Sequence, residues 1–197
     1  MRKLLIYLPL LLLLAAASCR KTADTPVLLD PTSPTAARTQ LKVLRDTVEA
    51  RWRVMRDSDN QKLVATKAVL QELRRLPGSN KDLIRRLDNA NDQLVGIRYD
   101  QETMASSERI DAYDLAQDSV LRAVYNLVEP QVNKNKDVEA LTAAIRAADD
   151  EVIGYRVRYD RAAKMYNNYL QLHAETLKQA GRKYANLQPL PLFELKN

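Results

Sequence analysis

The sequence has few of the residues that build disulfides, metal centres and sheets. Among its 197 residues there are four glycines, one cysteine, one histidine, one tryptophan and one phenylalanine. A single cysteine excludes an intramolecular disulfide and a cysteine-based metal cluster. One histidine cannot supply the ligand pairs of a metal-carboxylate helix bundle. Because Ala, Leu, Arg and Gln dominate the rest and favour helices, the composition predicts an all-α protein.

The chain also lacks the motifs of common enzymes and of nucleic-acid binders. It has no Gly-rich phosphate loop and no Gly-x-Ser-x-Gly elbow. The formal charge is +6, but both signs are interspersed along every helical stretch, which is typical of a solvated surface. Side chains of the acidic run 149–151 would point in different directions on a helix, and the lone His173 falls on an apolar face. We expect no catalytic residue, metal, cofactor or small-molecule substrate, and no nucleic acid.

The N-terminus has the plan of a secretory signal peptide. Residues 1–3 are basic, residues 4–17 form an apolar run, and small residues lead to Cys19. The stretch Ala-Ala-Ser-Cys at 16–19 resembles a bacterial lipoprotein box, in which the cysteine thiol takes a diacylglycerol. The box usually has leucine where Ala16 stands, and the alternative is ordinary cleavage that leaves a free thiol. We predict that residues 1–18 are a signal peptide and that Cys19 is lipidated.

The residues after the cysteine bear on location. Arg20 stands where an aspartate would favour retention in the inner membrane. Acyl chains anchor a protein stably, because each buried methylene adds about 0.8 kcal/mol. We therefore expect a lipid-anchored protein of the bacterial cell envelope, at the outer membrane and facing the periplasm. Residues 19–35 contain three prolines and should form an extended tether between the lipid and the folded domain.

Three long stretches carry apolar residues three and four positions apart, as on one face of a helix. The helices expected from them are 36–76, 80–128 and 137–187, together a domain at 36–187. Pro77 and Pro130 separate them, and the turns are short. The spacing predicts an antiparallel up-down-up bundle of three long helices with coiled-coil-like packing. A break in the weakly apolar stretch 101–107 would give four helices.

The spacing also predicts which side chains are buried. In the first helix these are Leu41, Leu44, Val48, Trp52, Met55, Leu63, Thr66, Leu70 and Leu73. In the second they are Leu83, Leu87, Ala90, Leu94 and Ile97, then Leu115, Ser119, Ala123 and Leu127. In the third they include Val138, Ile145, Tyr155, Tyr159, Tyr166, Tyr169 and His173.

The last residues, 188–197, form an apolar tail that holds the only phenylalanine, Phe193. Prolines forbid helix in this segment. We expect the tail to fold back against the bundle, and the alternative is a tail that binds a partner.

The third helix resembles the C-terminal helix of the LemA family. That family carries Arg-x-x-Tyr-Asn, then Tyr-Asn, then an aromatic residue, and the matching positions are Arg156, Tyr159, Tyr166, Asn167 and Tyr169. Trp52 and Phe193 lie in segments that resemble its first-helix and C-terminal elements. Asp160 replaces the first Asn, the family's Leu-Ile-Pro-Asn-Leu element is absent, and a lipoprotein signal replaces its uncleaved anchor. The resemblance implies an antiparallel helical bundle on a membrane tether, with no catalytic residues.

We therefore predict a non-enzymatic envelope lipoprotein of LemA-like type, whose helical domain binds a protein partner. The candidate partner-binding residues are Trp52, Arg156, Tyr159, Tyr166, Asn167, Tyr169 and Phe193. The alternative is a holdase-like periplasmic chaperone. It would hold unfolded proteins with an apolar groove and the basic tip around residues 74–86.

Overall fold

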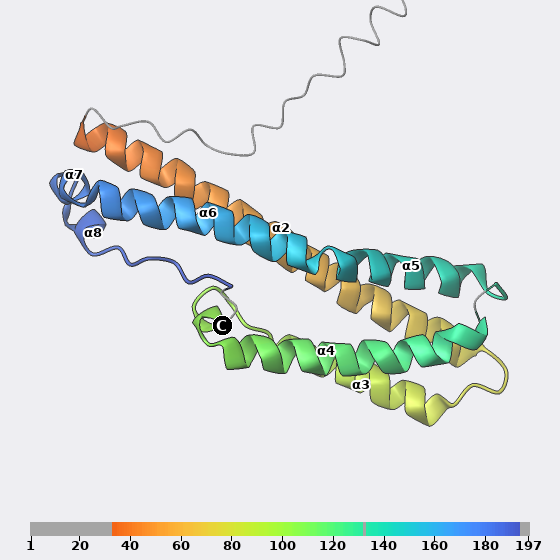
Figure 1. Cartoon of the computed structure of the whole chain (residues 1–197). Coiled ribbons are helices and arrows are strands. Elements are labelled where there is room, and N and C mark those ends of the chain that lie inside the picture. The colour runs from red at the N-terminus through yellow and green to blue at the C-terminus, as the bar shows by residue number, and fades with distance from the viewer. Residues whose placement is uncertain (1–32, 132, 194–197) are drawn as a thin grey trace, which may run out of the picture.

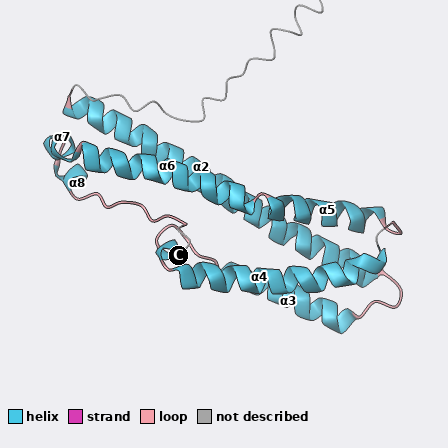
Figure 2. Cartoon of the chain, viewed as in Figure 1, coloured by secondary structure: helices cyan, strands magenta, loops and turns pink. Residues whose placement is uncertain are grey.

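The computed structural model describes residues 33–131 and 133–193 (Figure 1). The predicted signal peptide, Cys19 and most of the predicted tether lie outside these residues. Within the described ranges every regular element is helical and none is a strand, so the all-α class is confirmed (Figure 2).

The first element, α2 (Pro34–Arg75), begins two residues inside the predicted tether. Proline is tolerated at the start of a helix because the N–H that it lacks would have no partner there. The Ser33 hydroxyl caps the helix by accepting from the Ala36 backbone N–H at 3.2 Å. All nine side chains predicted to be buried on this helix are buried, so the apolar stripe is confirmed.

The predicted second helix is a hairpin of two helices, α3 (Lys81–Ile97) and α4 (Ser107–Val128), joined by the short turn η2 (Thr103–Ala105). Figure 1 shows α3 running back along α2 and α4 reversing beside it. The Asp100 carboxylate causes the break, since it accepts from the backbone N–H groups of Glu102 and Thr103 and from the Thr103 hydroxyl. These hydrogen bonds hold the pKa of Asp100 below its ordinary value. The predicted bundle of three long helices is therefore not confirmed, and the second helix is broken at the stretch 101–107, as in the alternative that its weakly apolar residues predicted.

The reversal also changes which face of α4 is buried. The predicted stripe was wrong at Leu115, which is 69% exposed, and at Ser119, which is exposed. By contrast, Ala123 and Leu127 are partly buried against the core. Ile97, at the end of α3, is 50% exposed. The buried side chains of α4 are Tyr113, Gln117, Val120, Leu121, Val124 and Val128.

The predicted third helix is divided into α5 (Lys136–Asp150), α6 (Val152–Leu172), α7 (Ala174–Gln179) and α8 (Arg182–Ala185). His173 interrupts it with φ −114° and ψ 24°, and its ring packs 4.4 Å from that of Tyr169. Gly181 interrupts it with φ 130°, a value that side chains disfavour. α5 and α6 both pack on α2, and most of the predicted stripe is buried there.

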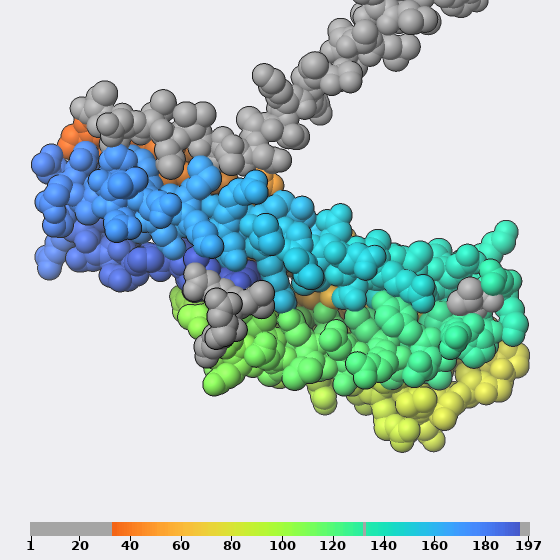
Figure 3. All heavy atoms as spheres, in the orientation of Figure 1, coloured from red at the N-terminus to blue at the C-terminus, as the bar shows by residue number. Residues whose placement is uncertain are grey.

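The body is elongated, and α2 runs along its whole length of about 60 Å. α3, α4 and α5 lie beside the second half of α2, and α6 lies beside the first half (Figures 1 and 3). The segment after α8 turns back along α6 toward the middle of the body. Across residues 33–131 and 133–193, no helix combines the length and apolarity needed to cross a bilayer.

Candidate functional site

Aromatic side chains from four distant parts of the sequence meet near the middle of α2. Trp52 of α2 lies with its ring centroid 5.4 Å from that of Tyr159 on α6 and 6.4 Å from that of Phe193 in the tail. Phe193 and Tyr159 are 5.6 Å apart. Tyr99, from the turn after α3, lies 6.3 Å from Trp52 and 5.8 Å from Phe193. These spacings are favourable for aromatic pairs, and we call the four residues the aromatic cluster.

Side chains of α6 hold the backbone of the tail beside this cluster. The Asn167 amide donates to the Leu190 carbonyl at 2.8 Å, and its oxygen accepts from the Leu190 N–H at 2.7 Å. The Tyr159 hydroxyl donates to the Pro191 carbonyl at 3.2 Å. The Asp160 carboxylate accepts from the Phe193 N–H at 2.9 Å. Residues 159, 160 and 167 therefore form a seat for an extended, proline-containing segment.

Arg156 covers the other side of the aromatic cluster. Its guanidinium lies 5.2 Å from the Phe193 ring centroid and donates to Asp114 at 2.7 Å and to the Tyr99 hydroxyl at 3.2 Å. Burial lowers the pKa of Arg156, but the Asp114 carboxylate and Tyr99 outweigh it, so the pKa is raised above its ordinary value. Arg156 is therefore a permanent cation, which suits a cation–π contact and not proton transfer.

A buried polar network lies next to the cluster and centres on Asp59 of α2. Its carboxylate accepts from the Tyr113 hydroxyl at 2.7 Å, from the Gln117 amide at 3.0 Å and from Arg98 at 3.2 Å. Burial and the negative charge of Asp59 raise the pKa of Tyr113 well above its ordinary value. The network ties α4 and the end of α3 to α2.

Sequence reasoning missed this network, although a signal for it was present. Asp59 lies four residues from Met55 and from Leu63, so it occupies a position of the apolar seam. A charged residue at a seam position predicts a buried polar partner. Tyr99 was missed because it lies in a turn, where no helical spacing applies.

The candidate residues do not all belong to one site. Trp52, Arg156, Tyr159, Asn167 and Phe193 meet in the cluster and the tail seat. Tyr166 and Tyr169 lie further along α6 and are buried against α2, where the Tyr169 hydroxyl donates to the Ala37 carbonyl at 3.3 Å. Cys19 lies outside the described residues. Tyr159, Tyr166 and Tyr169 are thus core side chains, whereas Tyr155, on the same helix, is half-buried.

Two hollows border the site. A small cavity of about 40 Å³ lies between the aromatic cluster and Asp59, which is room for one or a few water molecules. An open groove of about 710 Å³ runs beside the tail, with Glu49 and Trp52 on one side and Asp100, Glu102 and Pro189 around the rest. In the described part of the chain, no three His, Cys, Asp or Glu side chains gather as a metal site would require.

Comparison of the chain with family models, with curated proteins and with solved structures gave no significant match. The resemblance to the LemA family therefore depends on the motif residues alone.

Proposed function

We propose that this protein is a lipid-anchored scaffold of the bacterial cell envelope that binds a protein partner and catalyses no reaction. The observation that carries the proposal is the order of features along the chain. An acylation box at 16–19 is followed by a proline-rich stretch and then by a helical rod that starts at Pro34. In extended form, the stretch between Cys19 and Ser33 would reach about 45 Å, at about 3.1 Å per residue.

The tail seat supports a protein as the partner. A side-chain amide that both donates to and accepts from one backbone residue, as Asn167 does with Leu190, recognises an extended chain independently of its side chains. Aromatic surfaces beside proline-containing segments are a recurring mode of peptide recognition. The open groove next to Pro189 continues this surface. An extended segment of a partner fits such a groove, next to the protein's own tail.

Kinship with the LemA family is part of the proposal. The three segments that carry the resemblance lie in α2, in α6 and in the tail, and Trp52, Tyr159 and Phe193 bring them into contact. Three motif segments that contact one another support the resemblance better than three separate matches would, because the contact gives a physical reason for these residues to occur together.

Photo-crosslinking in intact cells tests the partner. A photoreactive residue replaces exposed Glu102 at the groove, and the control carries it at exposed Glu139 on α5. We expect one protein adduct from position 102, absent from position 139, and lost when Cys19→Ala removes the anchor. No adduct from position 102, or the same adducts from both positions, would contradict a partner at this groove.

The holdase-like chaperone is the second candidate. Four apolar side chains in the described ranges are 68–74% exposed, namely Val64, Leu115, Ile153 and Leu172. They lie on separate helices or far apart, and single exposed apolar side chains are common on protein surfaces, which favours the scaffold. An aggregation assay separates the two: a chaperone suppresses the aggregation of an unfolded client at near-equal concentration, and a dedicated scaffold does not.

A further inference from the structure

Another hollow lies at the end of the body where α2 begins, away from the aromatic cluster. It has a volume of about 470 Å³, within the range of sites for small ligands. Its floor is apolar, made by the buried side chains of Leu41 and Tyr166. Tyr184 on α8 and Leu187 after it form a further apolar wall. We call this hollow the basal pocket, and Figure 1 shows α7 and α8 at the end of the body where α2 starts.

The rim of the basal pocket is cationic. Four basic side chains line it, Arg38, Lys42, Arg45 and Lys183, and, of the residues that the structure describes, no carboxylate does. Lys42 pairs with Asp46, and Arg45 pairs with Glu49, each at 2.6 Å.

The other two rim cations have no such compensation. Within residues 33–131 and 133–193, neither Arg38 nor Lys183 forms an ion pair, and the Lys183 ammonium lies 4.9 Å from the Tyr184 ring centroid. The pocket thus combines an apolar interior with two positive charges at its mouth, a combination that fits an amphiphile with an anionic head.

We propose that the basal pocket binds an acidic membrane phospholipid, with its phosphate between Arg38 and Lys183 and its first acyl carbons on Leu41, Tyr166 and Leu187. The choice of a membrane lipid rests on the proposed function. The tether would keep the first turn of α2 within about 45 Å of the bilayer that holds the acyl chains of Cys19. An acidic leaflet attracts basic side chains near its surface. Bound lipid would hold the rod with its α2 start toward the membrane.

Photo-labelling of the full chain tests the pocket. The chain, purified in a neutral detergent, is incubated with a phosphatidylglycerol that carries a diazirine near the start of one acyl chain, and the labelled peptide is identified by mass spectrometry. We expect the label on the segment with Tyr184 and Leu187. The double variant Arg38→Gln/Lys183→Gln should weaken the affinity about 25-fold, from roughly fivefold for each cation.

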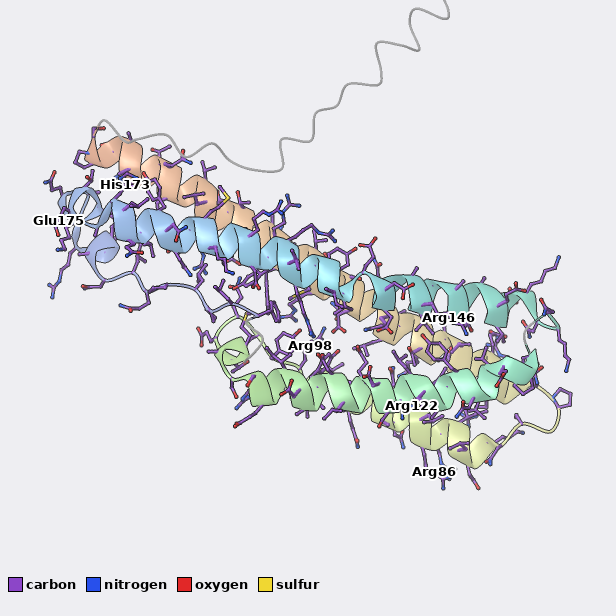
Figure 4. All side chains as sticks on the ribbon, viewed as in Figure 1. Arg86, Arg98, Arg122, Arg146, His173 and Glu175 are labelled. Atoms are coloured by element: carbon purple, nitrogen blue, oxygen red, sulfur yellow. The ribbon has the colours of Figure 1, made fainter. Side chains whose placement is uncertain are left out.

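A matched variant controls for net charge. Arg86→Gln/Arg122→Gln removes two exposed cations from α3 and α4, in the other half of the molecule (Figure 4). It should leave labelling unchanged. Equal loss in both double variants, equal labelling by a phosphatidylcholine probe, or labelling by a diazirine fatty acid but not by the phosphatidylglycerol would overturn the proposal.

The same photo-labelling of the full-length Cys19→Ala variant separates the pocket proposal from the proposed function. Because the pocket lies within the described domain, phosphatidylglycerol should label this variant as it labels the wild type. Labelling of the pocket in a protein whose Cys19 carries no lipid in cells would refute the anchor alone. Loss of labelling in a protein whose Cys19 is lipidated would refute the pocket alone.

Discussion

Replacing Phe193 with alanine should detach the tail and destabilise the bundle. The Phe193 ring stacks on Trp52 at 6.4 Å, meets Tyr99 and Tyr159 edge-on at 5.8 and 5.6 Å, and lies 5.2 Å from the Arg156 guanidinium. Truncating a fully buried Phe costs about 3–5 kcal/mol. Phe193 is half-buried, so about half of that cost applies. We expect the free energy of unfolding to fall by about 1.5–2.5 kcal/mol.

Trp52 makes this prediction measurable at the site itself. It is the only tryptophan and is 8% exposed, so its fluorescence reports on the aromatic cluster. In urea unfolding, followed by both circular dichroism and fluorescence, Phe193→Ala should lower the midpoint. Its native emission should also shift to longer wavelength, because water reaches the indole once the ring is gone.

Two variants serve as controls for this experiment. Phe193→Leu keeps an apolar side chain and should cost less than about 1.5 kcal/mol. Leu172→Ala removes an apolar side chain that is 74% exposed, and should change stability by less than about 0.5 kcal/mol. If Phe193→Ala behaves like Leu172→Ala and the emission of Trp52 does not move, the tail is not held on the cluster.

Further predictions concern the buried charges and phenols. Asp59→Asn should lower the free energy of unfolding by about 2–3 kcal/mol in urea, because it leaves Arg98 without a negative partner in a buried network. Lys62 is 2% exposed and pairs with Asp149 at 2.9 Å, so Asp149→Ala should cost about 1–3 kcal/mol, whereas Lys62→Met should change stability by less than about 1 kcal/mol. Burial raises the pKa of Tyr159 to about 12. The neutral Tyr159 phenol should contribute about 3 kcal/mol to the free energy of unfolding below pH 10, and this contribution should be lost as the pH rises from 10 to 12, because the phenol ionises first in the unfolded chain. Tyr159→Phe should reduce this loss in alkaline unfolding curves, and an unchanged curve would contradict it.

The sequence predicts α2 well because one continuous helix faces one core. Its stripe from Leu41 to Leu73 needs only helical spacing, and tertiary contacts do not alter it. The weakly apolar stretch 101–107 indicated where the second helix could break, but the apolar spacing alone could not predict that the chain reverses there. The reversal depends on Asp100, whose carboxylate accepts hydrogen bonds from backbone N–H groups that would otherwise continue the helix. The reversal in turn decides which face of α4 is buried.

The candidate site was predictable only in part. Trp52, Asn167 and Phe193 came from a family resemblance, but their contact depends on the path of the tail after Gly181. The apolar composition of the tail predicted that it folds back against the bundle, and Leu190, Leu192 and Phe193 do pack there. No local pattern, however, predicts which helix and which aromatic rings the tail meets. Tyr99 joins the cluster only because the turn at Asp100 places it there. Contacts between segments far apart in a sequence follow from packing, which the apolar spacing of each segment does not determine.

The state of Cys19 in cells decides whether this rod is a lipoprotein. Mass spectrometry of the N-terminal peptide, with and without metabolic labelling by a fatty acid, measures it in wild type and in Cys19→Ala. The account predicts a mature chain that starts at Cys19, carries a diacylglycerol on its thiol and leaves the envelope only with detergent, whereas Cys19→Ala takes up no label. A mature chain with a free thiol at Cys19 that is released without detergent would contradict it.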